Sequence, residues 1–417
     1  MIRCTMFTGP ATAPLREPKF RWYFLSRLVN LSGTTMAPVA LAFAVLEVTD
    51  SPSALGLVLA AHSIPQVIFL LAGGVLADRF GRTVVIQTGN VCAGVTQGLL
   101  AILLLSGQAE LWHFVVLGAL NGTVSAMTMP ALMGIVPALV PREQLQAANV
   151  LNSLVRNALG VLGPSVAALL VVTVGPGWAL AVDAVTWLAA ALLLLPVKLP
   201  PRPHTGVQPS MFAELRSGWH FVRSTTWLWV VVLAFIPLNA IHAGGLDTLG
   251  PMLADETDIG AHGWGLIVSA QGVGLLLMSL LMMRIRLRRP LLAGTVGIIF
   301  FGLPLLVMGV YPQTYAVMIA AVLAGMGIEI FGLGWNLAMQ EHVPDDMLAR
   351  AYSYDLVGSF LAIPVGQLAF GPLAVAYGIQ DVMFIGGIAY VAIAAAMLLS
   401  RSVRTLDRVS TTSPPAH

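Results

Sequence analysis

Long apolar segments, separated by short polar connections, run through almost the whole chain. Each is about 20 residues or longer, the length with which an α-helix crosses roughly 30 Å of hydrocarbon. Runs such as Leu99 to Leu105 and Ala392 to Leu399 lack the alternation that strands of a membrane β-barrel require. Because helices satisfy their own backbone hydrogen bonds in lipid, the pattern predicts an all-α membrane protein. The twelve expected helices cover residues 20–46, 54–76, 84–106, 111–138, 148–174, 178–198, 226–249, 262–283, 291–310, 313–338, 351–376 and 380–400.

Composition supports the same class. Of the 417 residues, 57% are hydrophobic and 10% are charged, whereas soluble globular domains carry about 25% charged residues. The mean hydropathy of +0.86 argues against a single large soluble core. The stretch before Phe20 is polar and basic, so we expect no cleaved signal peptide there. Cys4 and Cys92 lie in a polar tail and an apolar segment, which predicts neither a disulfide nor a metal pair. The formal net charge of +2 gives no indication of a nucleic-acid partner.

Lysine and arginine gather on one side of the predicted helices. All 21 lie in the two tails, in every second connection or its helix ends, or, for Arg27 and Arg156, inside a helix. The alternate loops instead carry the acidic residues Glu47, Asp50, Glu110, Asp255, Glu256 and Asp258. Because cytoplasmic ends of membrane helices retain basic residues, both termini and the central connection are expected in the cytoplasm. We expect a multi-pass protein of a bacterial cell membrane.

The chain contains an internal repeat. The run from Val140 to Ala148 resembles that from Val343 to Ala351, and each precedes a helix with a Gly-Pro pair, at Gly163-Pro164 and Gly371-Pro372. We therefore expect two six-helix halves, residues 1–198 and 226–417, with a substrate site between the repeats at mid-membrane.

Residues 199–225 form the predicted linker between the halves. The apolar side chains Phe212, Leu215, Trp219 and Phe221 leave a charged opposite face. This pattern favours a cytoplasmic amphipathic helix on the inner membrane surface, and a solvated linker is the alternative.

The connection after the second helix carries a motif. Its sequence, Gly74-Val75-Leu76-Ala77-Asp78-Arg79-Phe80-Gly81-Arg82-Thr83, resembles the signature loop of the major facilitator superfamily, with Thr83 in place of the usual basic residue. The resemblance implies the major facilitator fold and a conformational switch loop containing Gly74, Asp78, Arg79, Gly81 and Arg82. Asp78 can meet the positive end of a helix from the other half. An ordinary short loop whose arginines only set the orientation is the alternative.

Other stretches resemble one branch of that superfamily. Asp183 to Leu188 and Gln340 to Tyr354 are similar to the macrolide-efflux and enterobactin-exporter branch of drug:proton antiporters. Gly160 to Ala168 is similar to the antiporter Gly-Pro pattern, although Ala167 and Ala168 replace common glycines. The fourth helix lacks the arginine that proton-coupled drug exporters often carry, so coupling through that residue is excluded. The resemblance implies export of a small lipophilic drug, antibiotic or siderophore-like compound, by alternating access and in exchange for protons.

Polar residues inside the helices predict the substrate cavity. Arg27 and Asn30 share one helix face, and Asn152 and Arg156 share another. A charge inside a membrane costs roughly 2.5–3.5 kcal/mol, so these stripes should line a cavity unless the arginines reach back to the cytoplasm. The expected cavity residues are Arg27, Asn30, Asn152, Arg156, Asp183, Trp335 and Asn336. Asp183 and Asp247 lie near outer helix ends, and a wetted or capping carboxylate is the alternative to a substrate contact for each. Helix packing is the alternative to an apolar ligand surface for four other side chains, Trp187, Met326, Phe331 and Trp335.

Glu329 is our candidate for proton coupling. It lies about 15 residues past Thr314 and far from both ends of the tenth helix, with Gly325, Gly332 and Asn336 on its face. Burial disfavours the ionised carboxylate, which suits a group that takes up and releases a proton. A structural Glu329, paired with Arg156 or hydrogen-bonded across helices, is the alternative.

Several functions have little support in the sequence. We find no Gly-x-x-x-x-Gly-Lys loop, His-Glu-x-x-His pair or Gly-x-Ser-x-Gly elbow, so neither an ATP-driven pump nor an intramembrane enzyme is expected. The expected partners are a small-molecule substrate, protons and membrane lipids, with no cofactor, no metal and a monomeric state. Uptake of a sugar, organic acid or siderophore, and a non-transporting sensor or scaffold, remain the alternatives.

Overall fold

The computed structural model describes residues 10–49, 52–199 and 211–408. In these residues every regular element is a helix, and twelve helical spans are long and apolar enough to cross a membrane. The predicted all-α membrane fold is confirmed. The chain divides into two compact units: residues 1–218 with Asp345–Ser353, and residues 219–344 with Tyr354–His417. The predicted boundaries at 198 and 226 stay predictions.

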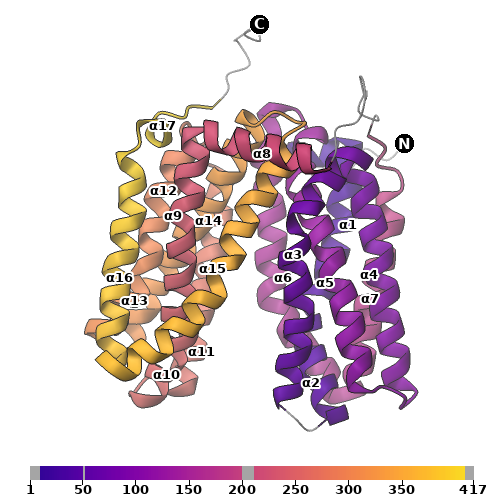
Figure 1. Ribbon diagram of the computed structural model, residues 1–417, viewed down its shortest axis with the longest axis horizontal. Coiled ribbons are helices and arrows are strands. Elements are labelled where there is room, and N and C mark those ends of the chain that lie inside the picture. The colour runs from indigo at the N-terminus through magenta and orange to yellow at the C-terminus, as the bar shows by residue number, and fades with distance from the viewer. Residues whose placement is uncertain (1–9, 50–51, 200–210, 409–417) are drawn as a thin grey trace, which may run out of the picture. The chain divides into compact units, whose positions relative to one another are not determined.

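The first unit contains six spans built from seven helices (Figure 1). Most helices run from one end of the unit to the other, and the first span is broken at Thr35 and Met36. Pro38 lies in the first turn after this break, where its missing N–H leaves no hydrogen bond unmade. The helices are α1 Pro18–Thr34, α2 Ala37–Thr49, α3 Pro52–Phe80, α4 Arg82–Leu105, α5 Leu111–Gly134, α6 Leu145–Val174 and α7 Pro176–Leu194.

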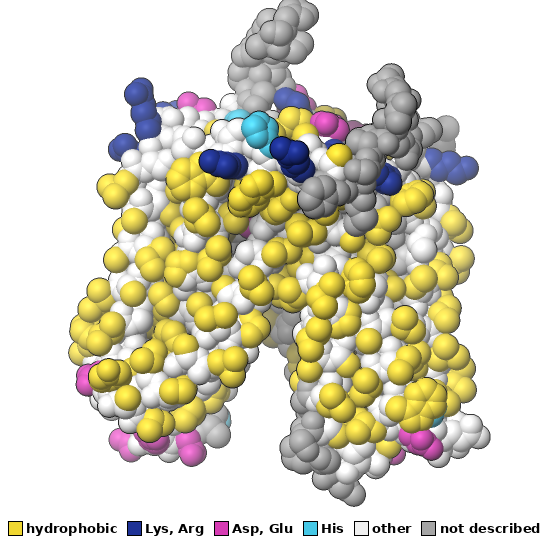
Figure 2. Space-filling view, viewed as in Figure 1, with side chains coloured by type: hydrophobic (Ala, Val, Ile, Leu, Met, Phe, Trp, Pro, Cys, Tyr) yellow, Lys and Arg dark blue, Asp and Glu magenta, His cyan; other side chains and the backbone are white. Residues whose placement is uncertain are grey.

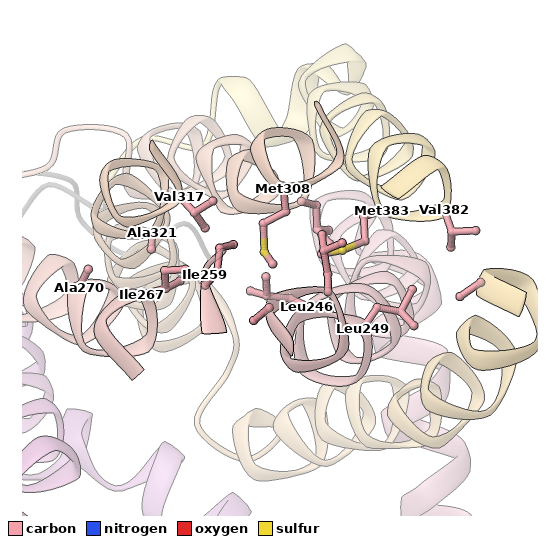
Figure 3. Close-up of a cluster of buried hydrophobic side chains, with 14 residues drawn as sticks. Leu246, Leu249, Ile259, Ile267, Ala270, Met308, Val317, Ala321, Val382 and Met383 are labelled. Carbon is pink, nitrogen blue, oxygen red and sulfur yellow. The ribbon is translucent and has the colours of Figure 1, made fainter. Parts of the chain in front are cut away.

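The second unit contains the other six spans. Two are irregular: one passes through a π-helical turn, His242–Thr248, and one through a single 3-10 turn, Phe300–Gly302. The helices are α9 Thr226–Ile241, α10 Leu249–Glu256, α11 Gly260–Met282, α12 Pro290–Ile299, α13 Leu303–Val310, α14 Thr314–His342, α15 Leu348–Tyr377, α16 Ile379–Ala396 and α17 Arg401–Arg404. A buried cluster contains residues from all six of these spans, with Leu246, Ile267, Met308, Val317 and Met383 among its members (Figure 3).

The fifth helix of each half starts three residues before the predicted position. α6 begins at Leu145 and α15 at Leu348, where the sequence predicted residues 148 and 351. Both leucines are fully buried, so packing extends each helix into a stretch that its polar neighbours led us to assign to a loop.

Residues 211–224 of the predicted linker are helical. Helix α8 covers Met211–Ser224, and Val222 on its apolar side is buried. Residues 200–210 lie outside the described part of the chain. Two helices, α8 and α15, are divided between the units, at Gly218 and at Ser353.

The surface of each unit matches a membrane environment. A broad apolar surface covers its middle, visible Lys and Arg side chains lie at one end, and a group of Asp and Glu side chains lies at the other (Figure 2). Val172, Leu368 and Val375 on the long spans are each more than three-quarters exposed. Such large apolar side chains on an outer surface are more stable in contact with lipid than with water.

Candidate functional site

The predicted switch loop is a tight connection between two long helices. α3 ends at Phe80 and α4 begins at Arg82, with Gly81 alone between them at φ 87°. Only glycine enters this left-handed backbone region without steric penalty. Gly81 therefore reverses the chain in a single residue and places Asp78 and Arg82 on either side of the turn.

Asp78 forms an ion pair within the first unit. Its carboxylate accepts a hydrogen bond from Nε of Arg350 at 2.9 Å, and both side chains are about nine-tenths buried. Arg350 also donates to the hydroxyl of Ser217 at 2.8 Å and to the carbonyl of Asp346 at 2.5 Å. The sequence predicted a helix end as the partner of Asp78. The structure places Asp78 beside the first turn of α15, where its partner is the guanidinium of Arg350. From the sequence, Arg350 was interpreted only as one of the basic residues that set the membrane orientation.

Gly74 and Arg82 of the switch loop also contact the start of α15 or the residues just before it. A Cβ atom on Gly74 would lie 2.3 Å from the Ser353 hydroxyl and 2.9 Å from the Ala349 carbonyl, so glycine permits this approach of α3 to α15. Arg82, 5% exposed, donates to the carbonyls of Gly134 and Asp345. Arg79 is half-buried at the end of α3.

The predicted polar stripes of α1 and α6 meet in the first unit. Nη1 of Arg27 donates to Oδ1 of Asn30 at 3.0 Å, and Arg156 lies within electrostatic range of Arg27 on α6, which packs against α1. Arg156 is exposed and donates to the Ser153 hydroxyl at 3.1 Å, while Asn152 is half-buried. The structure therefore brings Arg27, Asn30 and Arg156 into one cluster.

Asp183 does not lie on an open face. Its side chain is 0% exposed, and its Oδ2 accepts a hydrogen bond from Gln97 at 2.9 Å. A Cβ on Gly33 would lie 2.7 Å from Asp183 Oδ1, an oxygen without a hydrogen-bond partner. In this structure α1, α4 and α7 enclose Asp183, which is not a wetted carboxylate here, and its role in a substrate cavity stays a prediction.

Glu329 is buried in the second unit. Only 2% of it is exposed, and its Oε1 accepts a hydrogen bond at 2.8 Å from Ser279, which is fully buried on α11. A Cβ on Gly325 would lie 2.1 Å from the Gln271 carbonyl, so the face of α14 that carries Glu329 packs directly on α11. This geometry agrees with the alternative of a structural Glu329 that forms a hydrogen bond between two helices. The role of Glu329 in proton coupling stays a prediction.

Trp335 belongs to a packed aromatic cluster. Its ring is 5% exposed and contacts Trp227 edge-on and Phe331 by stacking, and Phe331 stacks on Phe235. The side chain faces packing partners rather than an open cavity, so the packing alternative describes Trp335 and Phe331 here. The neighbouring Asn336 is half-buried.

Asp355 was not among the site residues predicted from the sequence. It is half-buried on α15 and accepts a hydrogen bond from Trp335 Nε1 at 3.0 Å. The repeat could have shown it: the 203 residues that separate Val140 from Val343 also separate Asn152 from Asp355. Asp247, on the π-helical turn, is exposed, and its Oδ1 lies 3.6 Å from Nε2 of His242. Its exposure agrees with the alternative of a wetted carboxylate.

Comparisons with known proteins agree with this architecture. Residues 9–415 match the family described as transmembrane secretion effectors of the major facilitator superfamily, and the chain belongs to that family. Macrolide efflux protein A of Streptococcus pyogenes is 22% identical over 405 residues, which cover 93% of this chain and 97% of that protein. Enterobactin exporter EntS of Escherichia coli is 26% identical over 339 residues, which cover 80% of each.

Solved structures share the fold at lower identity. A bacterial homologue of the iron transporter ferroportin in an outward-facing state has a TM-score of 0.74 and 16% identity, covering 91% of this chain and 98% of that one. The Escherichia coli fucose:proton symporter FucP has a TM-score of 0.73 and 14% identity over the same shares. The chain is therefore a multi-pass membrane transporter of small molecules with the major facilitator fold, not an enzyme.

Proposed function

We propose that this transporter exports a small lipophilic compound from a bacterial cell by alternating access, in exchange for protons. The observation that carries alternating access is the buried pair of Asp78 and Arg350. The direction of transport is supported by the relatives, which are named as an efflux protein and an exporter.

The surroundings of Arg350 support a role in switching. Arg350 lies on α15 and binds Ser217 on α8, and these are the helices that are divided between the two compact units. Both partners belong to the first unit, so a shift of α15 that carries its first turn out of that unit would separate Arg350 from Asp78. An ion pair that forms in one state and breaks in the other sets the balance between the states.

Proton exchange is assigned to Glu329 within this proposal. Glu329 is buried inside a membrane span, and the hydroxyl of Ser279 can hydrogen-bond either form of its carboxyl group. Glu329→Gln should abolish transport driven by a pH gradient while protein yield stays normal. The control is Ser279→Ala, which removes the hydrogen bond and keeps the carboxyl group. If Glu329→Gln fails to fold and Ser279→Ala lowers yield in the same way, Glu329 is structural.

Direction is tested in inverted membrane vesicles of an expressing bacterium. An acidified interior should drive accumulation of a macrolide or a catecholate siderophore, and a protonophore should abolish it. Accumulation that requires a reversed gradient would indicate uptake, and no dependence on any gradient would remove proton exchange.

The proposed orientation is tested by thiol labelling. Cysteines at Gln108 and Asp258, both exposed, should react with an impermeant reagent added outside intact cells. A cysteine at the exposed Glu143 should react only after permeabilisation. Labelling of the Glu143 position from outside would invert the assignment that the basic residues favour. A monomer, surrounded by lipid alone, is the proposed functional state.

A further inference from the structure

We infer that the second unit binds anionic phospholipids through an exposed cluster of arginines at one of its ends. This cluster, the arginine surface, consists of Arg284, Arg286, Arg288, Arg401 and Arg404. All five residues belong to the second compact unit. Only the leaflet that supplies the lipid, the cytoplasmic one, depends on the proposed orientation of the chain.

Two segments far apart in the sequence supply the arginine surface, the connection between α11 and α12 and the short helix α17. The backbone N–H of Arg408 donates to the carbonyl of Arg288 at 3.2 Å, and α17 packs on α12 (Figure 1). The Arg408 side chain donates from Nε and Nη2 to Oε1 of Glu341, at 2.9 and 2.7 Å, and the Glu341 side chain is 2% exposed. These bonds fix the segment after the last span against the connection. Arginines that only set the orientation of the spans need no such convergence.

Buried apolar residues make the arginines face outward. Leu287, between Arg286 and Arg288, is 8% exposed, and Val403, beside Arg404, is fully buried. These two side chains hold their segments on the unit, whereas all five arginines of the surface are exposed. The guanidinium groups are therefore available to a ligand from outside the protein.

Acidic residues at this end neutralise other arginines. Asp407 pairs with Arg289 at 2.8 Å, and Glu341 pairs with Arg408. Within the part of the chain that the structure describes, none of the five arginines of the surface forms an ion pair. Like charges on one surface repel each other, and a bound anion offsets this repulsion. The arginine surface therefore has the charge of an anion-binding site.

Exposed apolar side chains border the arginine surface. Leu281 at the end of α11 and Ile285 in the connection are 41% and 42% exposed, and Leu399 just before α17 is 82% exposed. Guanidinium groups directly beside exposed leucine and isoleucine match an amphiphile with a phosphate and acyl chains. An acidic protein or a nucleic acid matches the charge but has no acyl chains to cover the apolar border. The border therefore favours a membrane lipid.

The chemistry of arginine suits a lipid phosphate. Its guanidinium stays charged at physiological pH and donates two parallel hydrogen bonds to phosphate oxygens. Phosphatidylglycerol and cardiolipin carry a net negative charge, whereas the ammonium group of phosphatidylcholine or phosphatidylethanolamine balances its own phosphate. Basic clusters directly cytoplasmic of a membrane helix attract the anionic lipids. We therefore expect the arginine surface to select phosphatidylglycerol over phosphatidylcholine.

The test measures which lipid lies beside the arginine surface, without any transport. A single cysteine replaces Leu399, in a full-length chain with Cys4→Ser and Cys92→Ser, and carries a bimane fluorophore. The protein is reconstituted in phosphatidylcholine bilayers with increasing shares of nitroxide-labelled phosphatidylglycerol or nitroxide-labelled phosphatidylcholine, because a nitroxide quenches the fluorophore only at short range. The matched control reporter is Val375→Cys, a position 90% exposed near the far end of α15.

We expect phosphatidylglycerol to quench the Leu399→Cys reporter with an affinity about fivefold higher than that of phosphatidylcholine, or more, and the Val375→Cys reporter with no preference. Glutamine at all five positions of the arginine surface should reduce the ratio of affinities to near one. The control variant removes five exposed basic residues from elsewhere on the basic side and should keep the ratio. It carries glutamine in place of Arg21, Arg142, Lys198, Arg216 and Arg223.

Two further measurements do not remove positive charge and so keep the residues that direct insertion. About 1 M NaCl shortens the Debye length to roughly 3 Å, so it should lower the ratio of the parent protein at least about threefold. Lysine at all five positions keeps the charge but loses the parallel hydrogen bonds, so a reduced preference should remain.

Several outcomes would overturn the inference. These are a ratio near one in the parent protein, an equal loss of preference in the control variant, and a ratio that salt leaves unchanged. Retention of an RNA oligonucleotide by the detergent-solubilised protein, without any lipid preference, would replace the lipid by a nucleic acid.

The proposed orientation is tested separately. A cysteine at Thr405, which is exposed in the same segment, should react with an impermeant reagent only after cells are permeabilised. Reaction in intact cells would overturn the proposed orientation and move the surface to the outer leaflet. A preference for phosphatidylglycerol in bilayers would still support the lipid site, because that measurement does not depend on which way the chain crosses the membrane.

Discussion

The fifth helices of the two halves, α6 and α15, share their contacts with the first span of their own unit but differ in charge. With the offset of 203 residues that relates Val140 to Val343, Gly163 pairs with Gly366. A Cβ on Gly163 would lie 2.1 Å from Oγ1 of Thr35, and one on Gly366 would lie 1.9 Å from the carbonyl of Ala240. Each glycine allows the fifth helix to touch the first span of its half.

The Gly-Pro pairs of the two helices do not occupy equivalent positions. With the same offset Gly163 corresponds to Gly366, and a Cβ on Gly371 meets no atom within 4 Å. Spacing from the start of the repeat, rather than the dipeptide, identifies the equivalent contact.

The polar and charged side chains of α6 and α15 are not shared between the repeats. Where α6 carries Asn152 and Arg156, α15 carries Asp355 and Ser359. The two repeats therefore agree where helix backbones approach each other closely, and they differ in the polar side chains on the fifth helix.

The largest expected effect comes from filling the helix contact. Gly366→Val should prevent assembly of the second unit, because the new Cβ meets the backbone of Ala240 rather than a flexible side chain. The yield of monodisperse protein in detergent measures this. Gly371→Val is the matched control and should express normally. Equal loss in both variants would mean that valine itself, not the contact, destabilises α15.

The switch pair should have the next largest effect. Arg350 on α15 has Ala147 as its counterpart on α6, so this device belongs to one repeat only. Asp78→Asn should slow transport at least about tenfold with normal insertion, because Arg350 then loses the charge that holds it. The rate in vesicles and the binding affinity for substrate are measured together.

An exposed ion pair provides the control for that variant. Arg289 and Asp407 are 50% and 65% exposed, so Asp407→Asn should leave transport unchanged. Normal turnover with lost substrate binding in Asp78→Asn would contradict the switch assignment.

The smallest effect concerns Asp355 itself. Asp355→Asn keeps an acceptor for the Trp335 N–H but changes the geometry and strength of a hydrogen bond that contributes about 0.5–1.5 kcal/mol. We expect destabilisation of about 1 kcal/mol, read as a melting temperature lowered by roughly 2–4 °C. Trp335→Phe should produce a similar shift, and the double variant should not exceed it by much.

Most of the fold could be predicted from the sequence, and part of the candidate site could not. Helix positions follow from apolar length alone, because lipid forces every backbone group into an internal hydrogen bond. The polar helix faces that carry Arg27, Asn30 and Arg156 could likewise be predicted from helical spacing. The partner of Asp78 was not, because Arg350 is 272 residues away and has no local signature. Nor did spacing show that Asp183 and Trp335 are enclosed, since burial depends on which helices pack on that face.

The separation of Asp78 and Arg350 also has a consequence for biosynthesis. A ribosome that adds 5–20 residues per second needs roughly 14–54 s to make the 272 residues between them. During that time the aspartate has already entered the membrane region with α3, and the guanidinium that pairs with it does not yet exist. The first unit is therefore completed only when Asp345–Ser353 emerges, near the end of translation. The nascent protein must keep Asp78 hydrated, or hold it with a temporary partner, until its own last helices arrive.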